Sequence, residues 1–201
     1  MQNKIIIISS PSGAGKTTIC NYLLKSFKNI EISISCTTRP KRKNEKNGQD
    51  YFFLSNDEFI KLKKKKYFIE TAKVFDYFYG SPAKNIKKAF SNNRHILFDI
   101  DWQGAKKLRK NFDKSQIIDF FILPPNKVEL KKRLKKRGRD NNQEIKKRLL
   151  LAVSEISHYN EYKYVLINDK ISNTVKNLIK IIDYFFYIDD INKTIKNYKL
   201  F

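Results

Sequence analysis

The chain has 201 residues, of which 41% are hydrophobic and 13% aromatic, and this composition excludes a protein that is disordered throughout. Its formal net charge is +22, but the lysines are spread along the whole sequence, so we interpret most of them as solvated helix faces and do not expect specific nucleic-acid binding. Only two cysteines occur, Cys20 and Cys36, a number that argues against a disulfide framework and favours a reducing compartment.

The apolar segments are too short or too interrupted to predict a membrane span. The four isoleucines at 5–8 are fewer than a signal peptide needs, and they lead directly into a glycine-rich loop. The late stretch "NLIKIIDYFFYI" contains Lys180 and Asp183, which indicates an amphipathic helix. We therefore expect a cytoplasmic protein that does not bind membranes.

Short apolar strands alternate with amphipathic helices along most of the chain. Near-continuous isoleucine, leucine and phenylalanine in the strands is typical of a parallel sheet that is covered on both faces. The pattern predicts an α/β fold with a parallel sheet flanked by helices. We expect strands at 4–9, 31–35, 94–100, 117–123 and 164–168, and helices at 16–27, 57–66, 82–92, 104–110, 126–137, 144–159 and 173–187.

Two regions interrupt this alternation. Residues 36–81 begin with a polar segment and continue with strand-like pieces around a helix, which predicts an inserted mixed α/β subdomain. Residues 135–148 begin with "KKRGRDNNQE" and hold several arginines, which predicts a small mobile lid. Ser81 followed by Pro82 is expected to start a helix, with the serine side chain as its cap. The remaining chain is assigned to a core of 1–35, 82–134 and 149–188 and a C-terminal tail of 189–201.

The stretch "SSPSGAGKTT" directly after the first strand is expected to bind phosphate. It differs from the phosphate-loop pattern G-x-x-x-x-G-K-[ST] only at Ser10, which stands in place of the first glycine. Glycines let the backbone turn successive amides towards phosphate oxygens, and the following helix adds its positive N-terminal end. Lys16 would bridge the β- and γ-phosphates of a triphosphate, and the Thr17 hydroxyl would ligate Mg²⁺. The residues expected to bind ATP in this loop are Ser12, Gly13, Ala14, Gly15, Lys16, Thr17 and Thr18.

A second apolar strand, "HILFDID", supports this interpretation. Asp99 stands at its end, in the position of a Walker-B carboxylate that would approach Mg²⁺ through a water molecule. The alternative is a helix-start turn that carries Gly-Lys-Thr by chance. The strand before the loop and the helix after it argue against that alternative.

Two arginines in the polar loop "SCTTRPKR" are candidates for a second phosphate site. Arg39 and Arg42 are three residues apart, and two guanidinium groups so spaced can hold one phosphate dianion. The hydroxyls of Tyr51 and Tyr79 would add donors. Taken alone, the two arginines could also be ordinary surface residues of a basic protein.

Seven segments of the sequence resemble guanylate kinases in their order and spacing. The match as a whole runs from about residue 5 to residue 169, and the segments read "SCTTRPKR", "GQDYFFL", "FIETAKVFDYFYGSP", "FDIDWQGA", "FILPP", "KKRLKKRGRD" and "EISHYNEY…VLIND". The segment "DIDWQGA" and the pair "TTRPKR" and "DYFF" are more specific signals than the phosphate loop. The resemblance implies an enzyme of purine nucleotide metabolism that transfers the γ-phosphoryl group of ATP to GMP, and to dGMP, with Mg²⁺.

The resemblance also implies roles for individual residues. The GMP phosphate would be held by Arg39, Arg42, Tyr51 and Tyr79, and the guanine would be surrounded by Ser35, Glu70, Ser81 and Asp101. Two carboxylates suit the N1–H and 2-amino donors of guanine, whereas adenine would leave a carboxylate unpaired. The lid arginines, which would act with Lys16 on the transferring phosphoryl group, are Arg133, Arg137 and Arg148, and Asn168 matches a position near the donor adenine.

The sequence departs from the family's pattern at a few positions. Phe78 replaces the first of two tyrosines, but only Tyr79 is needed for the phosphate, and we interpret Lys163 and Lys170 as surface changes. Two alternatives stay open: a catalytically silent guanylate-kinase-like binding module, and a related kinase that acts on ribose bisphosphate. The intact phosphate loop and acceptor arginines argue against the first, and the residues around guanine argue against the second. The sequence is compatible with a monomer or a homodimer.

Overall fold

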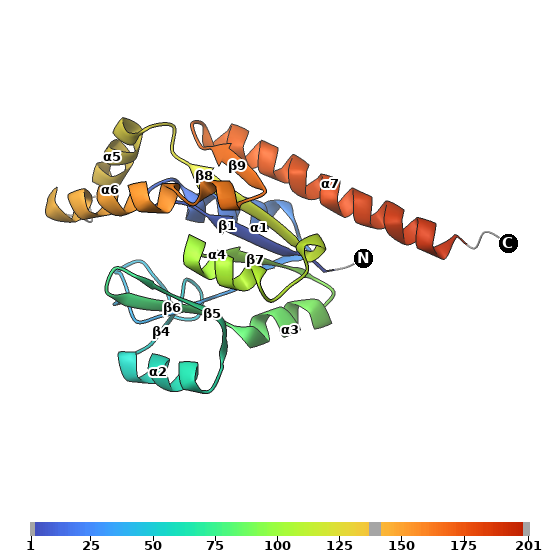
Figure 1. Ribbon diagram of the computed structural model, residues 1–201, viewed down its shortest axis with the longest axis horizontal. Helices are drawn as coiled ribbons and strands as arrows, with labels where there is room; N and C mark the ends of the chain where they lie inside the picture. The colour runs from blue at the N-terminus through green and yellow to red at the C-terminus, as the bar shows by residue number, and fades with distance from the viewer. Residues whose placement is uncertain (1–2, 137–141, 199–201) are drawn as a thin grey trace.

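The structure is a computed structural model that describes residues 3–136 and 142–198. Its centre is a five-stranded parallel sheet with the strand order β2-β7-β1-β8-β9 (Figure 1). The strands are β1 (Ile5–Ser9), β2 (Ile30–Ile32), β7 (His95–Asp99), β8 (Ile117–Leu123) and β9 (Tyr164–Ile167). A parallel sheet flanked by helices is the fold that the sequence predicted, so this expectation is confirmed.

Helices cover both faces of the main sheet, which explains why β1 is an unbroken run of isoleucines. Ile6 and Ile8 point to the face covered by α1 (Lys16–Ser26) and α7 (Ile171–Asn197). Ile5 and Ile7 point to the opposite face, which α3 (Ala83–Ser91) and α4 (Trp102–Arg109) cover. All five residues of β1 are buried, because alternate side chains enter one apolar core or the other.

The strand register brings the expected phosphate site and the expected Walker-B carboxylate together. β1 lies between β7 and β8, and Ile8 of β1 is level with Asp99 of β7. Both strands therefore end at the same edge of the sheet, and the loop after β1 begins beside Asp99.

A second, smaller sheet lies beside the main one and has the strand order β4-β3-β6-β5 (Figure 1). It has its own aromatic core, in which the fully buried Phe59 stacks on Phe68 and Phe78. The elements are β3 (Cys36–Thr37), β4 (Phe52–Phe53), α2 (Asn56–Lys64), β5 (Phe68–Val74) and β6 (Tyr77–Pro82). The sequence indicated β4, α2 and β5 but neither β3 nor β6. The division of the chain into core, subdomain, lid and tail stays our interpretation.

The prediction that Ser81 caps a helix is wrong. Ser81 lies in β6 and is fully buried, and its hydroxyl donates to Glu70 Oε1 at 2.6 Å. The N-cap of α3 is Pro82, which makes no side-chain capping hydrogen bond. A buried carboxylate needs a donor more than an accessible helix end does, so the hydroxyl turns inwards.

Two helices, α5 (Lys127–Lys136) and α6 (Asn142–Ile156), project together from the end of the molecule opposite to the C-terminal end of α7 (Figure 1). They pack on each other through one small apolar cluster that includes Leu130, Leu134 and Ile145. Residues 137–141 lie outside the described residues, and Arg137 is among them. The mobility of the expected lid therefore stays a prediction.

Helix α7 is longer than the expected helix at 173–187, since it continues to Asn197. Its extension is held to the sheet by Lys4, whose ammonium group lies 2.8 Å from Asp189 Oδ2, and by Phe186, which stacks on His95 at 4.1 Å. Within the described part of the chain, no helix combines the length and the apolar character needed to cross a membrane. Two short 3-10 helices, Lys114–Gln116 and Tyr159–Glu161, complete the set of described elements.

Candidate functional site

The loop between β1 and α1 has the backbone conformation that phosphate binding requires. Gly13 and Gly15 have φ values of 95° and 101°, in the left-handed region that favours glycine. A Cβ atom at Gly15 would also lie only 2.6 Å from Asn168 Nδ2. Ser10, in the place of the first pattern glycine, is outside the positive-φ region, and its hydroxyl donates to Pro11 O at 3.0 Å. A serine is therefore tolerated at Ser10, while both inner glycines are needed.

Lys16 and Asp99 form an ion pair at the opening of this loop. Lys16 is the first residue of α1 and Asp99 the last of β7, and Lys16 Nζ lies 2.5 Å from Asp99 Oδ1. Lys16 Nζ also donates to Ile100 O at 3.2 Å. Burial alone would lower the pKa of Lys16, but the Asp99 carboxylate outweighs it and raises that pKa above its usual value. The lysine is therefore firmly protonated, as a phosphate ligand must be.

The oxygen donors beside Lys16 fit a magnesium ion that is shared with nucleotide phosphates. Mg²⁺ in such sites takes one or two protein oxygens, and water and phosphates supply the rest. The Asp99 carboxylate and the exposed hydroxyl-bearing residue Thr17 match this donor set. The described residues contain no cluster of three or more histidine, cysteine, aspartate or glutamate side chains able to hold a metal without phosphates.

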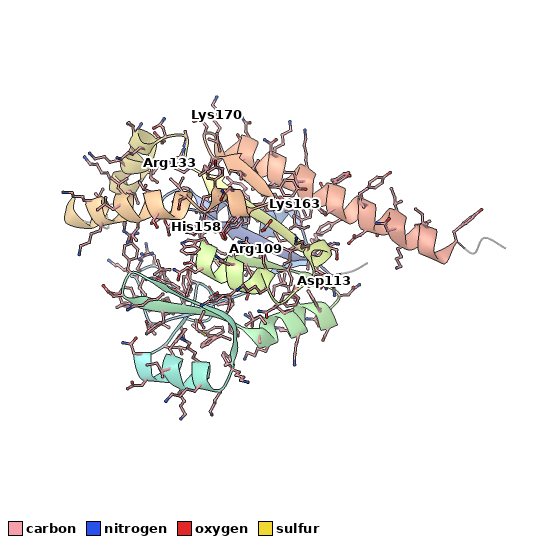
Figure 2. The ribbon with its side chains drawn as sticks, viewed as in Figure 1. Arg109, Asp113, Arg133, His158, Lys163 and Lys170 are labelled. Atoms are coloured by element: carbon pink, nitrogen blue, oxygen red, sulfur yellow. The ribbon has the colours of Figure 1, made fainter. Side chains whose placement is uncertain are left out.

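Asn168 connects the loop after β9 to the phosphate loop. The Asn168 side chain is buried, its Nδ2 donates to Ala14 O at 2.7 Å, and its Oδ1 accepts from the Thr174 hydroxyl at 3.1 Å. Arg133 of α5 donates from Nη1 to Asn168 O at 2.9 Å, so it lies against this loop (Figure 2). Arg148 of α6 reaches the phosphate loop itself, where it donates to Ser12 Oγ at 3.1 Å.

A carboxylate that the sequence did not single out organises the two acceptor arginines. Glu45 accepts from Arg39 Nη1 at 3.0 Å and Nη2 at 2.7 Å, and from the Arg42 backbone N–H at 2.8 Å. Burial alone would raise the pKa of Glu45, but these donors lower it. In the sequence, Glu45 is an acidic residue six positions after Arg39 and three after Arg42 in an otherwise basic loop. Its role could not be predicted, because it depends on the conformation of the loop.

Two tyrosines lie next to Arg39. The Arg39 Cζ atom is 5.6 Å from the centre of the Tyr51 ring, and Tyr51 meets Tyr79 edge to face at 5.9 Å. Burial, together with the nearby Asp99 carboxylate, raises the pKa of Tyr51 to about 12, so its hydroxyl stays protonated and can donate.

The four residues expected around guanine lie together: Ser35, Glu70 and Ser81 are buried, and Asp101 is half-buried. The Ser81 hydroxyl donates to Glu70 Oε1 at 2.6 Å and lies 3.0 Å from Ser35 Oγ. Burial, with a further contribution from Asp101, raises the pKa of Glu70 to about 7, and burial also raises that of Asp101. Asp101 Oδ1 accepts from the Gly104 N–H at 2.9 Å at the start of α4.

Gly104 is a second residue that the sequence did not single out. A Cβ atom there would lie 2.6 Å from Glu70 Oε2, so any other residue would displace the carboxylate. The motif "DIDWQGA" therefore serves the pocket twice, because Asp101 provides a carboxylate and Gly104 makes room for another.

If GMP is the acceptor, as the sequence resemblance implies, replacing Glu45 with alanine should raise the KM for GMP about tenfold and leave kcat within about twofold, because Arg39 loses a bidentate partner that orients it. Steady-state kinetics with varied GMP would measure both constants. Glu31→Ala is the matched control, since Glu31 pairs with Arg94 at 3.3 Å at the β2–β7 edge, away from this loop. A lower KM in Glu45→Ala would mean that Glu45 only competes with phosphate for Arg39.

A phosphate loop after the central strand of a parallel sheet, with a carboxylate at the end of the neighbouring strand, defines a phosphate-loop NTPase fold. The sequence profile of guanylate kinases matches residues 2–184. Among curated relatives, the guanylate kinase of Rickettsia prowazekii is 46% identical over 178 residues, 89% of either chain, and that of Rickettsia bellii is 43% identical over 89% of this chain and 92% of its own. The crystal structure of guanylate kinase from Anaplasma phagocytophilum is similar, with a TM-score of 0.74, 36% identity and coverage of 90% of this chain and 85% of that one. The chain belongs to the guanylate kinase family.

Proposed function

We propose that the protein transfers the γ-phosphoryl group of ATP to GMP, giving ADP and GDP. The observation that carries this proposal is the buried carboxylate of Glu70, with Asp101 beside it and Lys16 of the phosphate loop acting on Asp101. A buried, ionised carboxylate is unfavourable unless hydrogen-bond donors satisfy it, and a ligand that brings further donors to this pair would stabilise it. Guanine brings two N–H donors on one planar edge, whereas adenine has no N1–H and ribose bisphosphate has no base.

The donor side would bind ATP through the loop amides, Lys16 and Thr17. The positive charge of Lys16 is fixed by its position at the start of α1 and by Asp99, so no reorganisation is needed when charge develops on the phosphates. Thr17 and Asp99 would hold Mg²⁺, which supplies charge neutralisation at the β- and γ-phosphates.

The acceptor side would hold GMP by its phosphate and its base at once. Arg39 and Arg42, oriented by Glu45, neutralise the phosphate, and Tyr51 and Tyr79 donate to it. The attacking atom is a phosphate oxygen that is already ionised near neutral pH, so no general base is required.

The two histidines fit a mechanism without a general base. His95 is buried in the core, where burial lowers its pKa to about 4. His158, which is labelled in Figure 2, stacks on Trp102 at 3.5 Å and binds Glu161 at 2.6 Å. Neither is arranged to remove a proton from GMP.

The arginines of α5 and α6 would stabilise charge on the transferring phosphoryl group when the lid closes. Arg148 already contacts the phosphate loop, and Arg133 lies at the loop after β9. Closure would also exclude water, which otherwise accepts the phosphoryl group. Arg137 completes the proposed set and is outside the described residues.

The cofactor, the range of acceptor sugars and the cellular compartment can also be proposed. We propose that Mg²⁺ is required and that dGMP is accepted, because the assigned contacts involve the base and phosphate and not the 2′-hydroxyl. The two cysteines are free and buried, which supports a reducing cytoplasm as the place of action.

A coupled ADP-release assay with ATP and Mg²⁺ tests the function. The acceptors compared are GMP, dGMP, AMP, UMP, CMP and ribose 1,5-bisphosphate. Turnover of GMP well above that of the other ribonucleotides is expected. Activity on a different acceptor would refute the guanine pocket, and a folded protein that is silent with all six would instead be a binding module.

A further inference from the structure

Helix α6 carries two polar side chains that bind the same residue of the phosphate loop. Glu155 Oε2 accepts from the Ser12 N–H at 3.1 Å, and Arg148 Nη1 donates to Ser12 Oγ at 3.1 Å. Glu155 and Arg148 are seven residues apart, about two turns, so they lie on one face of the helix. Ser12 is thereby bound to α6 through both its backbone and its side chain.

These contacts matter because the apolar attachment of α6 is small. The buried apolar cluster of α6 is the one in which Ile145, Leu149 and Ala152 meet Leu130 and Leu134 of α5. This cluster is separate from the two that cover the main sheet. Apolar contacts of this size are not directional. The hydrogen bonds to Ser12 are directional, so they contribute to specifying the position of α6 relative to the loop, together with the packing of the Arg148 guanidinium on the Phe75 ring at 5.6 Å.

The surroundings of Glu155 support a role in holding the loop. Burial raises its pKa to about 6, with a further increase from Asp101, while the Ser12 N–H, Lys16 and Arg148 favour the ionised form. A carboxylate is a poor ligand for a triphosphate, because the two repel each other. A carboxylate this close to the phosphate site is instead suited to bind protein donors.

We propose that Glu155 is a positioning residue for phosphoryl transfer: by binding the Ser12 N–H it fixes α6 against the phosphate loop, and so sets the position of the Arg148 guanidinium group. The inference deepens the proposed function and rests on it. Glu155 does not touch the reacting atoms and acts through Arg148. Its loss should therefore lower the rate of transfer and not the capture of GMP.

A double-mutant cycle between Glu155 and Arg148 tests the proposal. Glu155→Ala should lower kcat about 10- to 100-fold, as expected for a lost hydrogen bond to a charged group, with the KM for GMP within about twofold of the wild-type value. Glu155→Gln keeps an oxygen acceptor for the Ser12 N–H and should recover most of kcat. In an Arg148→Ala background, Glu155→Ala should change kcat by less than about twofold, because the group that it positions is already absent.

The matched control is Glu161→Ala, which removes a carboxylate six residues along the chain that binds His158 and Arg109. It should leave kcat unchanged. Additive losses in the double variant, together with a lowered Tm, would reduce Glu155 to a structural residue and overturn the proposal. An unchanged kcat with a lower KM for ATP would also overturn it, since Glu155 would then only compete for the Ser12 amide. Wild-type turnover of GMP in the same assay separates these outcomes from a failure of the proposed function.

Discussion

Lys16→Ala is expected to lower kcat at least about a thousandfold, the scale seen when a fixed electrostatic stabiliser of a transition state is removed. Lys16 is protonated and held at the start of α1 by Asp99, so the variant loses a positive charge that needs no rearrangement to act. The measurement is ADP release at saturating ATP, GMP and Mg²⁺. Near-normal turnover would mean that Lys16 serves only as the ion-pair partner of Asp99.

Two further variants separate the chemical effect of Lys16 from its effect on folding. The alanine substitution leaves the Asp99 carboxylate, which is 18% exposed, without its partner, and this should lower the free energy of unfolding. Lys16→Ala combined with Asp99→Asn should recover stability but not activity. Lys25→Ala, in the last turn of α1, is the control and should change neither quantity.

The main sheet could be predicted because its strands carry their signal within themselves. β8 was expected at 117–123 and is found there, since a strand buried on both faces is apolar at every position. β3 and β6 could not be predicted, because they pair across about 40 residues of chain and β3 has only two residues. Each forms a strand only because it pairs with a distant strand, and the sequence of one segment does not show which segment it pairs with.

In the candidate site, too, residues within one segment could be predicted, and residues that depend on other segments could not. The phosphate loop is local, so its glycines and Lys16 could be assigned from spacing. Glu45, Gly104 and Glu155 were missed because their partners are in other segments or depend on a loop conformation. Ser81 was interpreted as a helix cap for the same reason: its true partner, Glu70, is 11 residues away on the neighbouring strand.

Glu70→Gln is expected to make the protein more stable at pH 8 and at the same time nearly unable to use GMP. The pKa of Glu70 is raised from 4.5 to about 7 in the folded protein. The protonated Glu70 carboxyl therefore makes its full contribution to the free energy of unfolding below pH 4.5. This contribution is lost as the pH rises through 7, because the ionised carboxylate is disfavoured where it is buried. At 1.36 kcal/mol per pKa unit, the loss approaches about 3 kcal/mol. A neutral glutamine avoids it and still accepts from Ser81.

Glu70→Gln should also lose the use of GMP, because the ionised carboxylate that destabilises the fold is the group that would bind guanine. The ionised carboxylate accepts from the Ser81 hydroxyl, and guanine would add its N1–H and 2-amino group as further donors. A glutamine amide offers only one acceptor atom to all of them. We expect kcat/KM for GMP to fall at least about a hundredfold, while the KM for ATP stays the same. Denaturant unfolding at pH 5 and pH 8 measures the change in stability, with Glu31→Gln as the control. Steady-state kinetics with varied GMP measures the change in kcat/KM. A variant that is less stable than the wild type at pH 8, or that keeps its kcat/KM for GMP, would exclude Glu70 as the residue that reads guanine.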